Sequence, residues 1–332
     1  MADRIRWGIL GTGRQALLRF IPGVAASCNG VVAALASRDQ GRAQDAAAKL
    51  GIEHAYGSYE ALLADDGVDA ISNPLPNSMH GEWTPRASEA GKLVLCEKPL
   101  ARDAAEARRM VDGGRRHGVL LMEAFMYRFH PRHLRVRALL DAGVIGEIRL
   151  VRATNIFLMD PINPGNVRLQ GSLAGGALMD VGCYTVHAAR MLFAEEPLWA
   201  SAQYDFREDF GVDMTLAGIL GFSDGRMAMI DGSFRTSRQG WYMVAGTKGQ
   251  IELPVAFTNV APDTSILITD DNGQREEHFA GVNQFTLEAE EFADALLQGR
   301  PVSIPPEDGV ANMRVIDALY RSATAQGLRV PL

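Results

Sequence analysis

The sequence predicts an α/β protein: a doubly wound parallel sheet followed by an α+β region with a large open, mostly antiparallel sheet. Strands and helices alternate through the first third of the chain, and a glycine-rich turn follows the first strand. After residue 200, apolar strand-like runs follow one another without intervening helices. The 332 residues favour two domains, because single hydrophobic cores stop growing at about 250–300 residues.

The first domain is expected to cover residues 1–124. Short apolar runs predict strands at 6–10, 30–36, 68–72, 93–96 and 119–122. Helical spacing of apolar residues, with glycine stops, predicts helices at 16–25, 42–50, 59–64, 79–90 and 104–116. Strands separated by helices of this length form right-handed crossovers, and therefore a parallel sheet.

The second domain is expected to cover residues 125–332, because the pattern changes near 123–130. Strands are predicted at 147–157, 201–206, 214–222, 226–233, 241–246, 250–253 and 265–268. Helices are predicted at 133–141, 178–193, 285–297 and 309–325, and the last of these could pack back on the first domain. Consecutive strands joined by short turns indicate antiparallel pairing.

Composition excludes several classes of protein. The net charge of −7 and pI near 5.6 argue against a surface for nucleic acid or anionic membranes. No stretch approaches the ~18 apolar residues of a membrane-spanning helix, and the first residues do not resemble a signal peptide. The three cysteines lack Cys-x-x-Cys spacing, which favours the reducing cytoplasm. We expect no metal site, because Pro131 interrupts the spacing of His130 and His133 and no further cluster accompanies them.

A glycine-rich turn at residues 11–16 predicts a dinucleotide site. Gly11 allows the tight turn, Gly13 lets the backbone approach a pyrophosphate, and Ala16 lets the helix pack closely on the sheet. The alternative is a purely structural glycine turn. The cofactor-binding residues expected here are Gly11, Thr12, Gly13, Arg14 and Gln15.

The end of the second strand favours NADP over NAD, which stays possible. NAD sites usually place an acid there to bind the ribose hydroxyls. This strand ends instead in Ser37 and Arg38, and a guanidinium matches a phosphate with two parallel hydrogen bonds. Asp39 leaves the choice open, since a shift of one residue would make it the ribose ligand.

A charged pair, Glu97-Lys98, ends the buried strand at 93–96. Ligands bind at the carboxyl ends of strands in open α/β sheets, and a buried ammonium is costly unless it is paired. Lysine is rare in this chain, and it can be tuned to release a proton where arginine cannot. The alternative is a structural salt bridge. The four lysines are Lys49, Lys92, Lys98 and Lys248.

Four motifs together resemble the glucose–fructose oxidoreductase / inositol dehydrogenase family, often called Gfo/Idh/MocA. Beside the glycine turn, they lie at 74–80, 97–99, 123–131 and 175–184, so the resemblance covers essentially the whole chain. Within the family, the chain resembles the NADP-dependent dihydrodiol and D-xylose dehydrogenases. Ser72-Asn73 departs from the family's usual aromatic and aliphatic pair before Pro74.

The resemblance implies hydride transfer between a nicotinamide and a hydroxyl-bearing carbon of a sugar, polyol or cyclic diol. It implies that Tyr184 carries the proton with Lys98 as electrostatic partner, or with these roles exchanged. Asp180 would orient the substrate hydroxyl or Lys98. Asp180 and Tyr184 are four residues apart on a predicted helix, so they could also be a hydrogen-bonded structural pair.

Further site residues are expected from their places in the chain. Additional cofactor contacts are expected from Pro74, Leu75, Asn77, His80 and Glu97. Substrate contacts are expected from Arg128, Phe129 and Arg168. For His80 and Arg128, a structural role is an equal alternative, at a helix start and in an ion pair with Glu123 respectively.

Two other functions stay open. One is a keto-sugar reductase of the anhydrofructose type, and the other is a catalytically silent, dinucleotide-sensing regulator. The resemblance also implies a homodimer or homotetramer assembled through the carboxyl-terminal sheet. We expect a cytoplasmic enzyme with a small-molecule substrate and neither nucleic-acid nor membrane partners.

Overall fold

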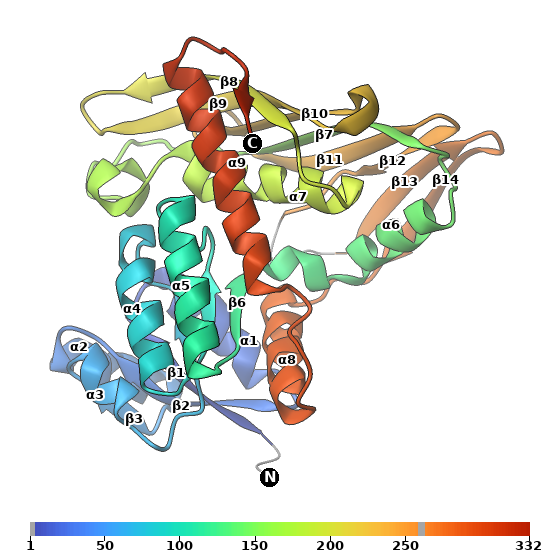
Figure 1. The fold of residues 1–332 in the computed structure, drawn as a ribbon. Coiled ribbons are helices and arrows are strands. Elements are labelled where there is room, and N and C mark those ends of the chain that lie inside the picture. Colours follow the sequence, from blue (N-terminus) through green and yellow to red (C-terminus); the bar gives the residue numbers. More distant parts are fainter. Residues whose placement is uncertain (1–3, 258–262) are drawn as a thin grey trace. The chain divides into compact units, whose positions relative to one another are not determined.

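The computed structural model describes residues 4–257 and 263–332, which divide into two compact units. Unit 1 comprises the described residues up to Met126 together with Asn283–Val310. Unit 2 comprises the described residues of Tyr127–Val282 and Ala311–Leu332. The chain therefore returns to unit 1 after its second sheet, whereas the sequence pattern suggests one cut near residue 124 (Figure 1).

Unit 1 contains a six-stranded parallel sheet in the order β3-β2-β1-β4-β5-β6. This order changes direction between β1 and β4, which is where doubly wound sheets bind nucleotides. The predicted fold class of this part is confirmed. Its strands are β1 (Ile5–Leu10), β2 (Gly30–Ala36), β3 (His54–Tyr56), β4 (Ala70–Asn73), β5 (Leu93–Glu97) and β6 (Leu121–Ala124).

Helices cover both faces of this sheet, as expected for right-handed crossovers. They are η1 (Ala16–Phe20), α1 (Ile21–Ala25), α2 (Gln40–Leu50), α3 (Tyr59–Leu63), α4 (Asn77–Glu89), α5 (Ala104–His117) and α8 (Gln284–Leu297). The sequence does not predict β3, because three residues are too few to show a period.

The first helix begins with a wide π turn that the sequence pattern does not reveal. The N–H of Ile21 donates to the carbonyl of Ala16, five residues earlier. Pro22 follows; it has no N–H, and its ring crowds the carbonyl four residues before it. The wide turn accommodates Pro22, which follows the turn by two residues.

Helix α8 belongs to unit 1 because it completes that unit's core. The ring centroid of Trp7 lies 5.2 Å from that of Phe20 and 5.3 Å from that of Phe292 on α8. All three side chains are almost completely buried. Gly23 permits this close packing, since a Cβ there would lie 2.7 Å from the Cβ of Phe285.

Unit 2 contains a nine-stranded sheet in the order β14-β13-β12-β11-β7-β10-β9-β8-β15. Among the described strands of this sheet, only β7 and β10 pair in parallel, which confirms the mostly antiparallel sheet. The strands are β7 (Ile148–Ile156), β8 (Trp199–Arg207), β9 (Val212–Gly221), β10 (Met227–Ser233), β11 (Gln239–Gly246), β12 (Gly249–Leu253), β13 (Thr264–Asp270), β14 (Gly273–Phe279) and β15 (Val330–Pro331).

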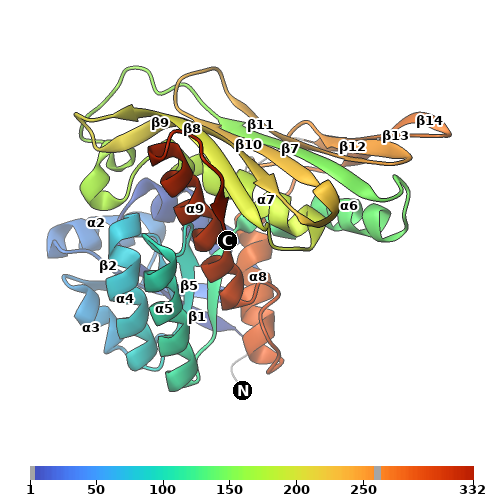
Figure 2. The ribbon, with the colours of Figure 1, turned by 45° about the horizontal axis from the view of Figure 1, so that its top comes forward.

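One face of this sheet is covered by helices, and α7 runs along it in Figure 2. The helices and helical turns in this part of the chain are η2 (Met126–Phe129), α6 (Pro131–Asp141), η3 (Val167–Leu169), η4 (Gly171–Leu173), η5 (Leu178–Gly182), α7 (Cys183–Phe193), η6 (Ser223–Gly225) and α9 (Pro306–Thr324). The first turn of α9 lies in unit 1. Strand β14 escapes prediction because its sequence is polar and it lies at the sheet edge.

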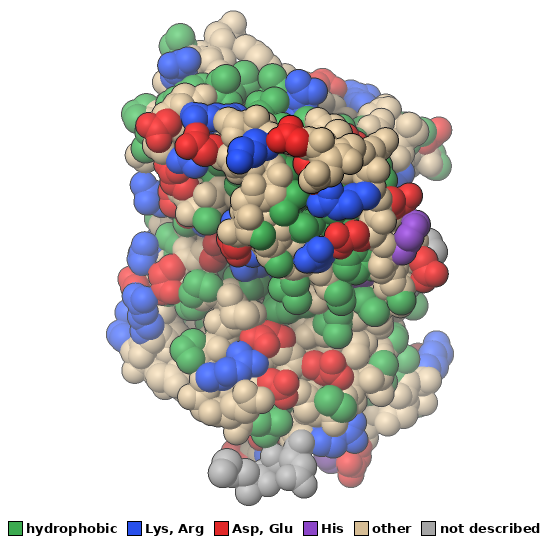
Figure 3. Space-filling view, turned by 90° about the vertical axis from the view of Figure 1, so that its right-hand side faces the viewer, with side chains coloured by type: hydrophobic (Ala, Val, Ile, Leu, Met, Phe, Trp, Pro, Cys, Tyr) green, Lys and Arg blue, Asp and Glu red, His purple; other side chains and the backbone are tan. Residues whose placement is uncertain are grey.

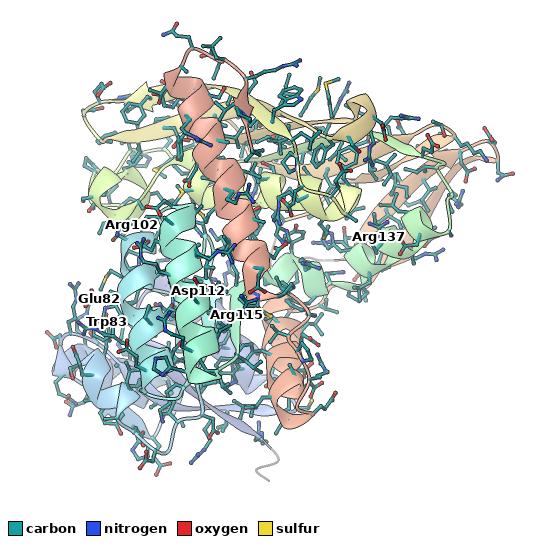
Figure 4. The ribbon with its side chains drawn as sticks, viewed as in Figure 1. Glu82, Trp83, Arg102, Asp112, Arg115 and Arg137 are labelled. Atoms are coloured by element: carbon teal, nitrogen blue, oxygen red, sulfur yellow. The ribbon has the colours of Figure 1, made fainter. Side chains whose placement is uncertain are left out.

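Charged side chains of both signs are interspersed on the face drawn in Figure 3. Many form surface pairs, such as Arg115 on α5 with Glu307 at the start of α9, at 2.5 Å (Arg115 is labelled in Figure 4). Within the described residues, no helix is both long and apolar enough to cross a membrane.

Candidate functional site

The glycine-rich turn after β1 is open toward the carboxyl end of the unit 1 sheet. Gly11 has φ +89°, and a Cβ there would lie 3.0 Å from the Cδ2 of Leu75. At Gly13, by contrast, a Cβ would meet no atom within 4 Å. The backbone at Gly13 is therefore accessible to a ligand, as close approach of a pyrophosphate requires.

Two arginines and a tyrosine lie beside this turn. Burial raises the pKa of Tyr59, while the positive charges of Arg38 and Arg42 oppose that rise. The Nη2 of Arg42 also lies 3.5 Å from the Oγ1 of Thr12 in the turn. The positive charges of both guanidiniums therefore lie near the glycine turn, where they could bind an anion.

Tyr59 is held firmly in this position. Its ring packs edge-on against Trp83 of α4, with ring centroids 4.8 Å apart (Trp83 is labelled in Figure 4). Arg86 in turn lies over the Trp83 ring, 4.6 Å from its centroid. This packing holds the phenol of Tyr59 in place beside Gly11.

Asp39 has a structural task in this structure. Its Oδ1 accepts a hydrogen bond of 2.9 Å from the N–H of Arg42, which caps the amino end of α2. The Oγ of Ser37, buried at the strand end, lies 3.3 Å from the N–H of Asp39. The N-cap role occupies a carboxylate that an NAD site would direct at the ribose.

Gln15 and Glu97 meet across the carboxyl end of the sheet. The Nε2 of Gln15 donates to the Oε1 of Glu97 at 2.7 Å. The N–H of Lys98 lies 3.3 Å from the other carboxylate oxygen of Glu97. The side chain of Lys98 itself is half-buried and follows the last residue of β5. The structure thus gathers the glycine turn and the Glu-Lys-Pro segment in one region of unit 1.

His80 differs from the expectation that it touches the cofactor. Its Nδ1 lies 3.0 Å from the carbonyl of Pro99 and its Nε2 lies 2.9 Å from the carbonyl of Leu75. The side chain is fully buried, and this burial lowers its pKa. His80 therefore connects the loop after β4 to the loop after β5, while Pro74 and Asn77 remain half-buried nearby in the chain.

In unit 2, Asp180 and Tyr184 lie on one continuous helix with a wide first turn. The N–H of Cys183 donates to the carbonyl of Leu178, five residues earlier. This π turn packs backbone to backbone on β10, since a Cβ at Gly232 would lie 2.8 Å from the Cα of Gly182. Wide turns of this kind occur frequently at functional sites.

The structure brings Arg168 and Asp180 together. The Nε of Arg168 donates to the Oδ2 of Asp180 at 2.6 Å. The negative charge of Asp180 raises the pKa of Arg168, and the Tyr184 phenol adds to that rise. The three predicted site residues of this region are thus electrostatically coupled within unit 2.

Asp213 anchors the turn that precedes this helix. Its carboxylate accepts hydrogen bonds from the N–H of Leu178 at 2.8 Å and from the Tyr320 hydroxyl at 2.7 Å. Gly176 has φ +114°, and a Cβ there would lie 2.2 Å from the Oδ1 of Asp213. The sequence alone does not single out Asp213, because its partners lie far away along the chain.

Two aromatic side chains pack against the ring of Tyr184. Its centroid lies 5.8 Å from that of Tyr127 and 5.7 Å from that of Phe257. The Tyr127 hydroxyl bonds the Nδ1 of His187 at 2.5 Å. The centroids of Tyr127 and Phe257 are themselves 5.3 Å apart, so these two rings form one cluster that packs against one side of Tyr184.

The remaining predicted residues are less closely tied to this region. Arg128 and Phe129 are half-buried on η2, and the charge of Arg128 helps lower the pKa of His133. Within residues 4–257 and 263–332, no group of three His, Cys, Asp or Glu side chains could hold a metal ion.

Comparisons with known proteins identify the family. Residues 5–125 match the model of an oxidoreductase family with an NAD-binding Rossmann fold, GFO_IDH_MocA. Residues 133–252 match the GFO/IDH/MocA C-terminal domain. The chain belongs to the GFO/IDH/MocA oxidoreductase family.

Characterised members of the GFO/IDH/MocA family are similar over nearly the whole chain. D-xylose 1-dehydrogenase (NADP(+)) 2 of Haloferax volcanii is 42% identical, with 96% of this chain and 97% of that protein covered. Trans-1,2-dihydrobenzene-1,2-diol dehydrogenase of Xenopus laevis is 31% identical, with 97% of each chain covered. The crystal structure of aldose-aldose oxidoreductase from Caulobacter crescentus has a TM-score of 0.92 at 28% identity, and covers 99% of this chain and 100% of that chain.

Membership of the GFO/IDH/MocA family confirms the resemblance drawn from the sequence motifs. Arg42 and Tyr59 also lie beside the glycine turn of unit 1, and neither was predicted from the sequence. For Arg42 a signal existed, since it follows Arg38 by four residues in the first turn of α2. For Tyr59 there was none, because only the packing of α3 on α4 places its phenol beside Gly11.

Proposed function

We propose that this protein is an NADP-dependent dehydrogenase that oxidises a hydroxyl-bearing carbon of a sugar, polyol or cyclic diol. The observation that carries the proposal is the pair of guanidiniums, Arg38 and Arg42, beside the open glycine turn. The names of two relatives, a D-xylose dehydrogenase that uses NADP(+) and a dihydrodiol dehydrogenase, support both the cofactor and the substrate class.

The residues of unit 1 fit a dinucleotide. The open backbone at Gly13 and the neighbouring Thr12, Arg14 and Gln15 would hold the pyrophosphate. Arg38 and Arg42, with Ser37, would bind the 2′-phosphate of the adenosine ribose through charge-assisted hydrogen bonds. Glu97, Pro74, Leu75 and Asn77 would border the nicotinamide half, with His80 holding the two loops together.

When bound, NADP would accept the hydride from the substrate carbon. The substrate hydroxyl must lose its proton as the hydride leaves, and Tyr184 is proposed to take it. Lys98 is proposed to stabilise the developing alkoxide with its ammonium. Arg128, Phe129 and Arg168 are proposed substrate contacts. Asp180, which forms an ion pair with Arg168, is proposed to orient the substrate hydroxyl or Lys98.

Replacing Tyr184 by Phe tests this proposal most directly, because it removes one hydroxyl and keeps the ring packing. We expect kcat on the best sugar of an aldose, polyol and dihydrodiol panel to fall about 10²–10⁴-fold. The dissociation constant of NADPH, measured by fluorescence titration, should stay unchanged. Wild-type turnover in the variant would refute the role of Tyr184.

The same residues could serve the reverse reaction, reduction of a keto-sugar, and the panel should include such substrates. Tight NADPH binding without turnover on any substrate would favour a dinucleotide-sensing regulator. We further propose a homodimer or homotetramer in the cytoplasm. Exposed apolar side chains on the open face of the unit 2 sheet support self-association, and the lack of any Cys-x-x-Cys spacing supports a reducing compartment.

A further inference from the structure

The hydroxyl of Tyr59 lies beside the first glycine of the glycine turn. Tyr59 is the first residue of α3, and it is buried, with an exposed fraction of 6%. A Cβ at Gly11 would lie 3.7 Å from the hydroxyl oxygen of Tyr59. The ring packs edge-on against Trp83, with centroids 4.8 Å apart, and this packing directs the hydroxyl at the turn.

This buried hydroxyl forms no hydrogen bond with any residue in the part of the chain that the structure describes. Other buried phenols of this protein do have protein partners. The Tyr242 hydroxyl lies 3.0 Å from the Nδ1 of His133, and the Tyr320 hydroxyl donates to Asp213 at 2.7 Å. Because buried polar groups are nearly always hydrogen-bonded, the Tyr59 hydroxyl requires a partner from outside the protein.

The hydroxyl lies where the ends of three strands of the unit 1 sheet meet. The N–H of Gly11, after β1, donates to the carbonyl of Ala36 at the end of β2, at 2.8 Å. The N–H of Ser37 donates to the carbonyl of Tyr56 at the end of β3, at 3.0 Å, and α3 follows after a short turn. The phenol therefore lies close to the end of β2, where doubly wound folds bind the adenosine ribose of a dinucleotide.

Arg42 reaches the same turn from α2. Its Nη2 lies 3.5 Å from the Oγ1 of Thr12, the residue that follows Gly11. Within residues 4–257 and 263–332, neither Arg38 nor Arg42 forms an ion pair with a carboxylate. Two available cations and a neutral O–H donor at adjacent positions of one turn suit a phosphate group, which has several strong acceptor oxygens.

The Tyr59 hydroxyl is able to donate a hydrogen bond at working pH. Burial raises the pKa of Tyr59, although the positive charges of Arg38 and Arg42 oppose that rise. The phenol therefore keeps its proton around neutral pH. A protonated phenol can donate that proton to an acceptor such as a phosphate oxygen.

We propose that Tyr59 is a further cofactor-binding residue, whose hydroxyl donates a hydrogen bond to the 2′-phosphate of NADP. The inference rests on the proposed function, in which Arg38 and Arg42 bind this phosphate. NAD carries a neutral hydroxyl at the same position, and a neutral oxygen accepts a weaker hydrogen bond than a phosphate oxygen. Tyr59 would therefore add to the preference for NADP without adding charge.

Replacing Tyr59 by Phe tests the inference, because it removes the hydroxyl and keeps the ring that packs on Trp83. The dissociation constant of NADPH, measured by fluorescence titration of the full chain, should rise about 10–100-fold, as for a lost hydrogen bond to a charged group. That of NADH should change much less. Adenosine 2′,5′-bisphosphate, which has the phosphate but no nicotinamide, should lose affinity by the same factor as NADPH in calorimetric titrations, whereas 5′-AMP should not.

Tyr56→Phe is the matched control, since it removes a phenol oxygen from the same segment. The Tyr56 hydroxyl donates to the Oδ2 of Asp65 at 2.9 Å, in the loop before β4, so its loss should leave NADPH affinity unchanged. Salt provides a second comparison. Added salt should weaken NADPH binding equally in the wild type and Tyr59→Phe, because the charges are the same, but less steeply in Arg42→Ala.

The outcomes separate this inference from the proposed function. A loss confined to NADPH and the bisphosphate supports the inference. An unchanged NADPH affinity in Tyr59→Phe refutes it, as does an equal loss for NADPH and NADH, and both results leave the proposed function standing. Failure of the wild type to bind NADPH refutes the proposed function itself. Should Tyr59→Phe not fold, Tyr59→Met removes the same hydroxyl and keeps an apolar side chain.

Discussion

Arg38 and Asp39 are neighbours in the chain, but they have different tasks. Asp39 caps the amino end of α2, with its carboxylate 2.9 Å from the N–H of Arg42. Arg38 is exposed, and its charge acts on the Tyr59 phenol together with that of Arg42. One residue thus starts a helix, and the other remains available to a phosphate.

Replacing Arg38 or Arg42 by Ala should weaken NADPH binding while NADH binding stays the same. Each charge-assisted hydrogen bond to the 2′-phosphate contributes about 1.5–3 kcal/mol, so each variant should lose about 10–100-fold in affinity. Fluorescence titration with both nucleotides measures the change. Arg109→Ala, which removes an exposed arginine on α5, is the control. An unchanged preference for NADPH in both variants would contradict the cofactor assignment.

Glu288 is the most unusual buried charge in unit 1. Its side chain is fully buried on α8, and neither carboxylate oxygen has a hydrogen-bond partner. Burial, and secondly the negative charge of Glu97, raise the pKa of Glu288 well above its ordinary value. The folded protein therefore holds a proton there that the unfolded chain releases at lower pH.

Glu288→Gln should stabilise the protein increasingly as pH rises. Native Glu288 binds its proton more tightly than the unfolded chain, so its contribution to stability is lost from about pH 4.3 upward, through its raised pKa. Glutamine carries no such charge. We expect the difference in Tm between variant and wild type to grow from pH 5 to pH 8. Glu53→Gln, at an exposed site, is the control, and a constant difference across this range would contradict the prediction.

At the scale of elements, the helix that carries Asp180 and Tyr184 depends on close backbone contacts. Gly182 lies against Gly232 of β10, and Gly176 lies against the carboxylate of Asp213. Asp213 also bonds the N–H of Leu178 at the helix start. The helix is therefore seated on the sheet by main-chain packing, which determines where its side chains point.

Gly176→Ala should destabilise unit 2 more than an alanine at an unobstructed glycine. The left-handed backbone alone costs about 1–2 kcal/mol, and the new Cβ would also displace Asp213. Gly225→Ala is the matched control, because Gly225 has φ +71° with no atom within 4 Å of a Cβ. Thermal unfolding of both variants measures the difference, and equal losses of stability would show that the Asp213 contact has no cost.

At the scale of the whole molecule, the open face of the unit 2 sheet carries adjacent apolar side chains. Met229 is 44% exposed and Ile219 is 36% exposed, and the two residues are register partners on β10 and β9. Met227, on the same face of β10, is 40% exposed. Isolated exposed apolar residues are ordinary, but a group on a flat sheet suits an interface between copies.

Met229→Glu should shift the protein toward smaller assemblies. A carboxylate would be buried without a partner in an interface at this face, so association would weaken at least about tenfold. Sedimentation measures the change in mass. Leu134→Glu, at a 63% exposed position on α6, should leave the assembly unaltered. An unchanged mass in Met229→Glu would place the interface elsewhere.

The sequence determined most of the element pattern, because apolar periodicity and glycine or proline signals are local. It also predicted roles for Lys98, Asp180 and Tyr184 through family motifs, and it placed the glycine turn through its spacing. The errors have physical causes: β3 is too short to show a period, β14 is polar, and α8 belongs to unit 1 through contacts with Trp7. A contact between residues far apart in the sequence, such as Trp7 and Phe292, leaves no pattern in the local sequence.

Only the tertiary structure determines which polar side chains pair with one another. The sequence presents Arg168, Asp180, Asp213 and Tyr320 as four separate polar residues, with no indication of which pairs form. Packing joined Arg168 to Asp180 and Tyr320 to Asp213. The reason is that hydrogen bonds and ion pairs are short-range, so they depend on where the fold places each side chain rather than on residue type.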